Sequence, residues 1–153
     1  MMQKNELQIT PLQPEHIGQM AEIEKLCFSE PWSEDTIRDE LDTPLSRYFV
    51  CAEGDRVLGY IGTRILLDQC DITNIAVHPD VRRGGIATLL LSELERTVKP
   101  MGVAVLYLEV RVSNTPARAF YEKSGFVPVG KRKNYYSLPT EDAILMTKSL
   151  EEQ

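Results

Sequence analysis

The stretch from Asn74 to Ala87, NIAVHPDVRRGGIA, is the most informative part of this sequence. Residues 71–78 show the period of two that is typical of a strand, with Ile75 and Val77 on one face and Ala76 on the other. Residues 86–98 then repeat apolar side chains at helical spacing, at Ile86, Leu90, Leu94 and Val98. The sequence therefore predicts a strand, a glycine-rich turn and an amphipathic helix in direct succession.

The turn between this strand and helix has the composition of an anion site. Gly84 and Gly85 let the backbone approach a ligand closely, and the first N–H groups of a helix are unpaired beside the positive end of its dipole. Arg82 and Arg83 add two positive charges. A plain turn with two solvated arginines is the alternative on glycine content alone, but the whole succession favours a pyrophosphate-binding site.

Patterns on both sides of this unit complete a mixed α/β fold. The predicted strands are residues 7–10, 48–53, 57–67, 71–78, 104–110, 126–133 and 143–150, and the helices begin at Pro14, Ser33, Ile86 and Pro116. Residues 104–110 are almost wholly apolar and predict a strand buried on both faces. We expect a mostly antiparallel sheet flanked by helices, in one domain spanning residues 1–153 with a core of about 7–150.

Composition narrows the class of partner. The chain has 153 residues and a formal net charge of −6, which disfavours binding to nucleic-acid backbones and favours a basic peptide or protein substrate. Residues 101–108 form the longest apolar run, too short for a membrane span of about 20 residues. The start, MMQKNELQIT, lacks the apolar core of a signal peptide. A cytoplasmic protein is expected, and a monomer is favoured.

Cysteine and histidine usage argues against a metal centre. Cys27, Cys51 and Cys70 are widely spaced, and His16 and His78 are the only histidines. Neither a disulfide framework nor a zinc site is expected. Buried structural thiols are favoured over a catalytic cysteine, which stays open as an alternative.

The turn sequence resembles the acetyl-coenzyme A motif of the GCN5-related N-acetyltransferase (GNAT) superfamily, Q/R-x-x-G-x-G/A. This resemblance implies the GNAT fold and acetyl-coenzyme A as co-substrate, with no metal. It implies that Ile75, Ala76 and Val77 pair with the pantetheine arm. It further implies that the pyrophosphate is wrapped by Arg82, Arg83, Gly84, Gly85, Ile86, Ala87 and Thr88.

Two further residues stand out physically. Glu109 ends the apolar run on a strand that is expected to be central, where a carboxylate is costly unless it is paired, hydrated or used. Pairing with Arg111, two residues on, is the structural alternative. Tyr121 lies on the last helix, two turns after Asn114, and the structural alternative for it is core packing.

Nearly the whole chain, residues 7–150, resembles the ribosomal-protein alanine N-acetyltransferase (RimI-like) branch of that superfamily. The resemblance rests on LEVR at 108–111, SN at 113–114, AFY at 119–121 and GF at 125–126, together with residues 27–28, 31–33, 132–136 and 141–143. It implies that Glu109 is the general base, that Tyr121 is the general acid and that Asn114 contacts coenzyme A. It also suggests two substrate loops, with peptide contacts from Pro31, Trp32, Tyr135 and Tyr136. A core role for Trp32 is the alternative.

The resulting functional hypothesis is acetyl transfer from acetyl-coenzyme A to the N-terminal α-amine of a protein. By resemblance the target is an alanine terminus of a small-subunit ribosomal protein. Such an amine has a pKa of about 7.7–8.0, against about 10.4 for lysine, so a single carboxylate suffices to deprotonate it. The alternatives are another protein terminus, a lysine or a small-molecule amine as acceptor, and a non-catalytic module that binds coenzyme A or the ribosome.

Overall fold

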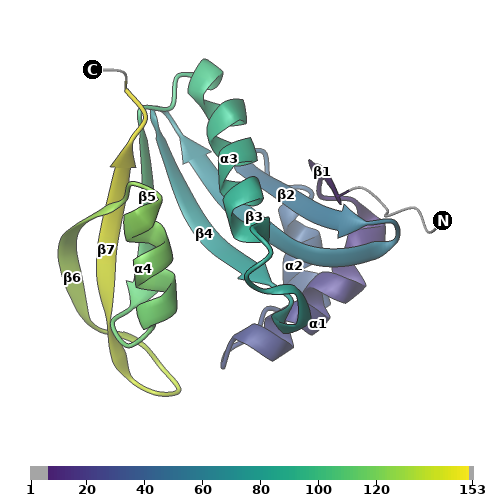
Figure 1. Ribbon diagram of the computed structural model, residues 1–153, viewed down its shortest axis with the longest axis horizontal. Helices are drawn as coiled ribbons and strands as arrows, with labels where there is room; N and C mark the ends of the chain where they lie inside the picture. Colours follow the sequence, from purple (N-terminus) through teal and green to yellow (C-terminus); the bar gives the residue numbers. More distant parts are fainter. Residues whose placement is uncertain (1–6, 152–153) are drawn as a thin grey trace.

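The computed structural model describes residues 7–151 and contains one seven-stranded sheet with helices on both faces (Figure 1). The strand order is β1-β2-β3-β4-β5-β7-β6. The strands are β1 (Leu7–Pro11), β2 (Ser46–Glu53), β3 (Arg56–Leu66), β4 (Gln69–Val77), β5 (Val105–Arg111), β6 (Val127–Tyr136) and β7 (Glu141–Ser149). The helices are α1 (Ile17–Cys27), α2 (Glu34–Glu40), α3 (Ile86–Val98) and α4 (Thr115–Lys123), and short 3-10 turns lie at Pro14–His16, Pro79–Val81 and Lys99–Met101.

This architecture confirms the predicted mixed, mostly antiparallel sheet. Every neighbouring pair of strands is antiparallel except β4 and β5. The predicted order of strands and helices is also confirmed, and α3 has the predicted bounds. Residues 1–6 and 152–153 of the expected domain, and most of the segment considered for a signal peptide, lie outside the described residues.

The sheet opens between β4 and β5. Residues Gln69, Cys70 and Asp71 pair with Val105, Leu106 and Tyr107, and the pairing stops there. Farther along, β4 pairs only with β3, and β5 pairs only with β7. Figure 1 shows the two strands diverging from this short parallel contact. The edges of β4 and β5 that face each other are therefore free to line a site.

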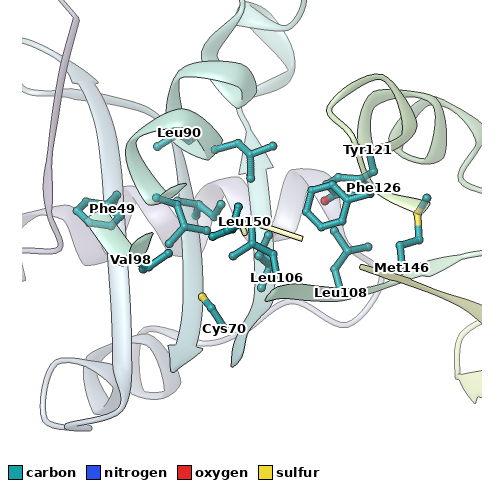
Figure 2. Packing of buried hydrophobic residues seen from close by; sticks show 14 of the residues in the cluster. Phe49, Cys70, Leu90, Val98, Leu106, Leu108, Tyr121, Phe126, Met146 and Leu150 are labelled. Atoms are coloured by element: carbon teal, nitrogen blue, oxygen red, sulfur yellow. The ribbon is translucent and has the colours of Figure 1, made fainter. Parts of the chain in front are cut away.

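Two hydrophobic clusters hold the helices to the sheet. The larger lies under α3 and α4 and includes Leu90, Leu106 and Phe126 (Figure 2). The smaller lies under α1 and α2 and includes Ile17 and Tyr60. Strand β4 contributes to both, as its period of two predicts: Ile75 and Val77 pack against the larger cluster, while Ala76 belongs to the smaller one.

Two details of the predicted strands were wrong. Strand β5 is not buried on both faces, because Leu106, Leu108 and Val110 are buried while the alternate residues are only partly buried. The face that carries Glu109 therefore has access to solvent. Tyr135 and Tyr136 end strand β6 and do not lie in a loop, since β6 continues to Tyr136 through an irregularity after Arg132.

The cysteines are all free thiols. Cys51 and Cys70 are buried as predicted, and burial raises the pKa of both thiols, that of Cys70 to about 11. Cys27 is only half-buried, so the prediction of buried thiols was wrong for this one. No helix in residues 7–151 has the length and apolarity needed to cross a membrane.

Candidate functional site

Two adjoining cavities occupy the opening between β4 and β5. The first, here called the α3 cavity, has a volume of about 750 Å³ and lies between the start of α3 and helix α4. The second, here called the β5 cavity, has a volume of about 350 Å³ and lies between the diverging strands and the segment after α1. Both are lined by Cys27, Phe28, Ile75, Asn114, Ala117 and Tyr121. The two cavities therefore meet at one point, beside Tyr121.

The start of α3 differs from the starts of α2 and α4. Ser33 accepts a hydrogen bond from the N–H of Thr36, and Asn114 accepts one from Ala117, so each caps its helix. Helix α3 begins after Gly85, which has φ +80 and offers no side-chain cap. Its first N–H groups have no partner within the helix, and the α3 cavity is lined by this end of the helix. The geometry suits an anionic group.

Most of the residues predicted to hold coenzyme A line the α3 cavity. They are Ile75, Ala76, Val77, Arg82, Arg83, Gly85, Ile86, Ala87, Thr88 and Asn114. Gly84 is the exception, because it belongs to the same turn but does not line the cavity. Arg82 is turned toward β4: its Nε lies 3.3 Å from the Val77 carbonyl oxygen and its Nη2 lies 3.2 Å from Cys27 Sγ.

Glu109 presents a carboxylate to the β5 cavity. Its Oε2 atom is buried and, within residues 7–151, accepts no hydrogen bond. The nearest cation is Arg132, whose Nε lies 3.7 Å from this oxygen. The alternative of a Glu109–Arg111 pair is wrong, because Arg111 pairs with Glu141 instead, at 3.1 Å. A buried acceptor without a donor is a group with spare capacity for a ligand's N–H.

Tyr121 has a packed ring in the wall shared by the two cavities. The ring makes edge-to-face contacts with Phe120 and Phe126, so the core-packing interpretation holds for the ring (Figure 2). Its hydroxyl makes no hydrogen bond within the described part of the chain. Burial is the main reason that the pKa of Tyr121 is raised, and the nearby Tyr136 adds to the shift. The hydroxyl therefore stays protonated at ordinary pH and can donate.

Arg111 joins the segments around the entrance of the β5 cavity. Its guanidinium donates to the carbonyl oxygens of Ser137 and Pro139, at 2.7 and 2.9 Å, and approaches Ser29 Oγ at 3.4 Å. It also stacks over the Tyr136 ring, 4.5 Å from the centroid. One side chain thus connects β5, the β6–β7 turn and the segment that follows α1.

The predicted substrate contacts are only partly brought together. Trp32 and Tyr136 line the β5 cavity, but Pro31 and Tyr135 do not. Trp32 also packs against the smaller hydrophobic cluster, so its two interpretations are compatible. Burial and then the charge of Glu109 raise the pKa of Tyr136 to about 12 and also raise that of Tyr135.

Sequence reasoning missed several polar residues of the β5 cavity, among them Glu24 and Asn74. Asn74 was read only as part of a strand. Glu24 lies four residues after Met20 and three before Cys27, so it falls on the apolar stripe of α1. A carboxylate at a buried helical position was the signal that would have found it.

The arrangement combines an anion site, a buried carboxylate and a tyrosine hydroxyl around one opening in the sheet. The α3 cavity can hold an elongated molecule with a phosphate group at the start of α3. The β5 cavity can hold an amine beside Glu109. In residues 7–151, no cluster of three or more His, Cys, Asp or Glu side chains is placed to hold a metal ion.

Comparison with known proteins agrees with this geometry. Residues 17–126 match the acetyltransferase (GNAT) family, and the chain belongs to that family. It is therefore an acyltransferase.

Among individual relatives, a Bacillus subtilis protein provisionally named ribosomal protein bS18-alanine N-acetyltransferase is 36% identical over 150 residues, covering 97% of this chain and 99% of the relative. The Escherichia coli ribosomal protein bS18-alanine N-acetyltransferase is 39% identical over 130 residues, covering 81% and 84%. The crystal structure of the ribosomal-protein-S18-alanine N-acetyltransferase from Escherichia coli superimposes with a TM-score of 0.88, at 33% identity, and covers 97% of this chain and 96% of that one.

Proposed function

We propose that this enzyme transfers the acetyl group of acetyl-coenzyme A to the N-terminal alanine of ribosomal protein bS18. The relatives named for this reaction align over most of both chains. A ribosomal-protein substrate puts the reaction in the cytoplasm. The buried Oε2 of Glu109, which accepts no hydrogen bond within residues 7–151, is the observation that carries the proposal, because the acceptor amine must lose a proton before or during attack.

The donor fits the α3 cavity. The pyrophosphate lies against the first N–H groups of α3, with positive charge from Arg82 and Arg83, and the pantetheine arm runs along Ile75 to Val77. The thioester then reaches the point where the two cavities meet. Asn114 lines both cavities there and contacts the coenzyme.

The acceptor enters the β5 cavity with its α-amine toward Glu109. The carboxylate takes a proton from the amine, directly or through a water, and the neutral nitrogen attacks the thioester carbonyl carbon. A carbon–nitrogen bond forms and the carbon–sulfur bond breaks. The thiolate of coenzyme A leaves and takes a proton from the Tyr121 hydroxyl, and the new amide nitrogen loses its surplus proton, which returns the Tyr121 phenolate to its protonated form. Trp32 and Tyr136, with Pro31 and Tyr135 beside them, flank the peptide that follows the amine.

Other acceptors are the competing function. Another protein terminus, a lysine or a small-molecule amine would use the same donor site. The relatives named for a ribosomal-protein substrate favour the N-terminal alanine over these acceptors.

Mass spectrometry of ribosomal proteins incubated with acetyl-coenzyme A and the enzyme tests the proposal. Unacetylated small-subunit proteins are the substrate, and the enzyme carrying both Glu109→Gln and Tyr121→Phe is the matched control. One added acetyl group at the N-terminal alanine of bS18, absent with the control, is the expected result. Equal acetylation of lysines or of polyamines would contradict it.

A further inference from the structure

Glu24 is a buried carboxylate in the wall of the β5 cavity that the proposed reaction does not use. Its side chain is 2% exposed and lies on α1. Within residues 7–151 it has no cationic partner, although burying an unpaired carboxylate is costly. Burial accordingly raises its pKa, against the effect of hydrogen bonds from Trp32 and Asn74.

Three donors from three parts of the chain converge on this carboxylate. The backbone N–H of Trp32 donates to Oε1 at 2.8 Å. The Tyr60 hydroxyl and the Asn74 side-chain amide donate to Oε2, the latter at 3.3 Å. Glu24 thus ties α1 to strands β3 and β4 and to the segment between α1 and α2. Bonds to a charged acceptor are about twice as strong as those between neutral groups.

The contacts of Glu24 reach both sides of the β5 cavity. Trp32 and Asn74 lie on different segments, and each lines that cavity. The carbonyl oxygen of the Asn74 side chain in turn accepts from the Thr73 hydroxyl at 3.0 Å and lies 3.2 Å from the Tyr48 hydroxyl oxygen. The orientation of the Asn74 amide is therefore fixed from both ends.

We propose that Glu24 is a positioning residue, which holds Trp32 and Asn74 in place as the two sides of the acceptor subsite. The kinetic consequence of this role depends on the proposed function. The placement of Trp32 itself does not depend on that function. Loss of the carboxylate frees the backbone of Trp32 and the amide of Asn74, so the subsite widens while the α3 cavity, which Glu24 does not line, keeps its shape.

Trp32 is the single tryptophan of the chain, so intrinsic fluorescence reports on it alone. The experiment compares wild type with Glu24→Gln. The control is Glu22→Gln, which changes a 70% exposed carboxylate on the same helix. Tryptophan emission and acrylamide quenching are measured without substrate. The KM for an N-terminal bS18 peptide without tryptophan, the KM for acetyl-coenzyme A and kcat are then measured.

In Glu24→Gln we expect red-shifted emission, stronger quenching and a KM for the peptide that is about 10-fold higher. The KM for acetyl-coenzyme A should stay within about twofold, and Glu22→Gln should match wild type throughout. Unchanged emission or unchanged peptide KM in a folded variant would overturn the proposal. A fall in kcat alone, or an equal rise of both KM values, would also overturn it.

Tyr60→Phe covers the case in which Glu24→Gln does not fold. It removes one donor and keeps the carboxylate, and we expect changes in the same direction, with a peptide KM about threefold higher. Wild-type behaviour of this variant would then reject the role. If wild-type enzyme does not acetylate the peptide, the proposed function fails, and the quenching comparison alone decides whether Glu24 positions Trp32.

Discussion

The two halves of the sheet on either side of the β4–β5 opening are built differently. Strands β1–β4 are covered by α3 on one face and by α1 and α2 on the other, and seven consecutive residues of β3 are buried. Strands β5–β7 pack mainly against α4, with one ion pair from Lys148 of β7 to Glu95 of α3, and nearly all of β6 is exposed. The first half presents main-chain atoms at the start of α3, and the second presents the side chains of Glu109 and Tyr121. In the proposed mechanism, the more deeply buried half binds the donor through its backbone, and the thinner half supplies the proton-transfer groups.

The largest effect is expected where the second half supplies chemistry. Glu109→Gln and Tyr121→Phe should each lower kcat by about 10²–10⁴-fold, because each removes one proton-transfer group. Binding of coenzyme A by titration calorimetry should be unchanged. Glu122→Gln, on the same helix as Tyr121, is the control. Activity within about twofold of wild type in both variants would remove the assigned roles.

Substitutions in the buried first half should lower stability more than substitutions in the exposed strand β6. Leu94→Ala, at a fully buried position of α3, should lower the free energy of unfolding by about 2–5 kcal/mol through lost contacts and a cavity. Val127→Ala, on the exposed strand β6, should change it by less than about 0.5 kcal/mol. Urea denaturation followed by circular dichroism measures both. Equal losses would mean that β6 is packed against something in solution.

Two glycine substitutions test whether the first half of the sheet binds coenzyme A through its backbone. Gly85 has φ +80, and an added Cβ meets no protein atom within 4 Å, so within the protein Gly85→Ala acts through backbone strain. Re-aiming the first N–H groups of α3 should weaken coenzyme A binding about 10-fold, as measured by calorimetry, without changing kcat. Gly18→Ala also adds a Cβ in open space, within helix α1, and is the control with unaltered binding.

The smallest expected effect is a pH dependence of the stability that Glu141 provides in the second half of the sheet. Hydrogen bonding from Ser113, and then from Arg111, holds the pKa of the Glu141 carboxyl below its usual range. This stabilisation is present above the ordinary pKa and is lost as pH falls through the lowered one. The deficit in stability of Glu141→Gln near neutral pH should therefore shrink in acid. A deficit independent of pH in urea titrations would show that charge has no part in it.

Local patterns predicted most of the fold. The helix of residues 86–98 was predicted with its observed bounds, because its apolar stripe and the preceding glycines are local signals. The half-exposed face of β5 could not be predicted, because the composition of that strand does not show that its neighbour β4 diverges. The full length of β6 could not be predicted either, because this strand is sustained by pairing with β7, which lies beyond a turn.

The candidate site was predicted to a different degree in its two parts. The residues of the turn after β4 are contiguous, so a motif placed them around one cavity. The alternative pairing of Glu109 with Arg111 was wrong because the partner of Arg111 is Glu141, which lies 30 residues away on β7. Glu24 was missed because its three donors come from separate elements, and only the folded chain brings them together.

Strand β6 is an edge strand of the sheet, and among residues 7–151 no strand lies beside its outer hydrogen-bonding groups. A long, flat edge strand can pair with the edge strand of a second molecule and cause aggregation. Here Pro128 withholds a donor, and irregularities follow Pro128 and Arg132. Lys131, Arg132 and Lys133 place consecutive like charges where a second copy would have to dock. These features of the exposed edge strand β6 disfavour β-pairing with a second molecule.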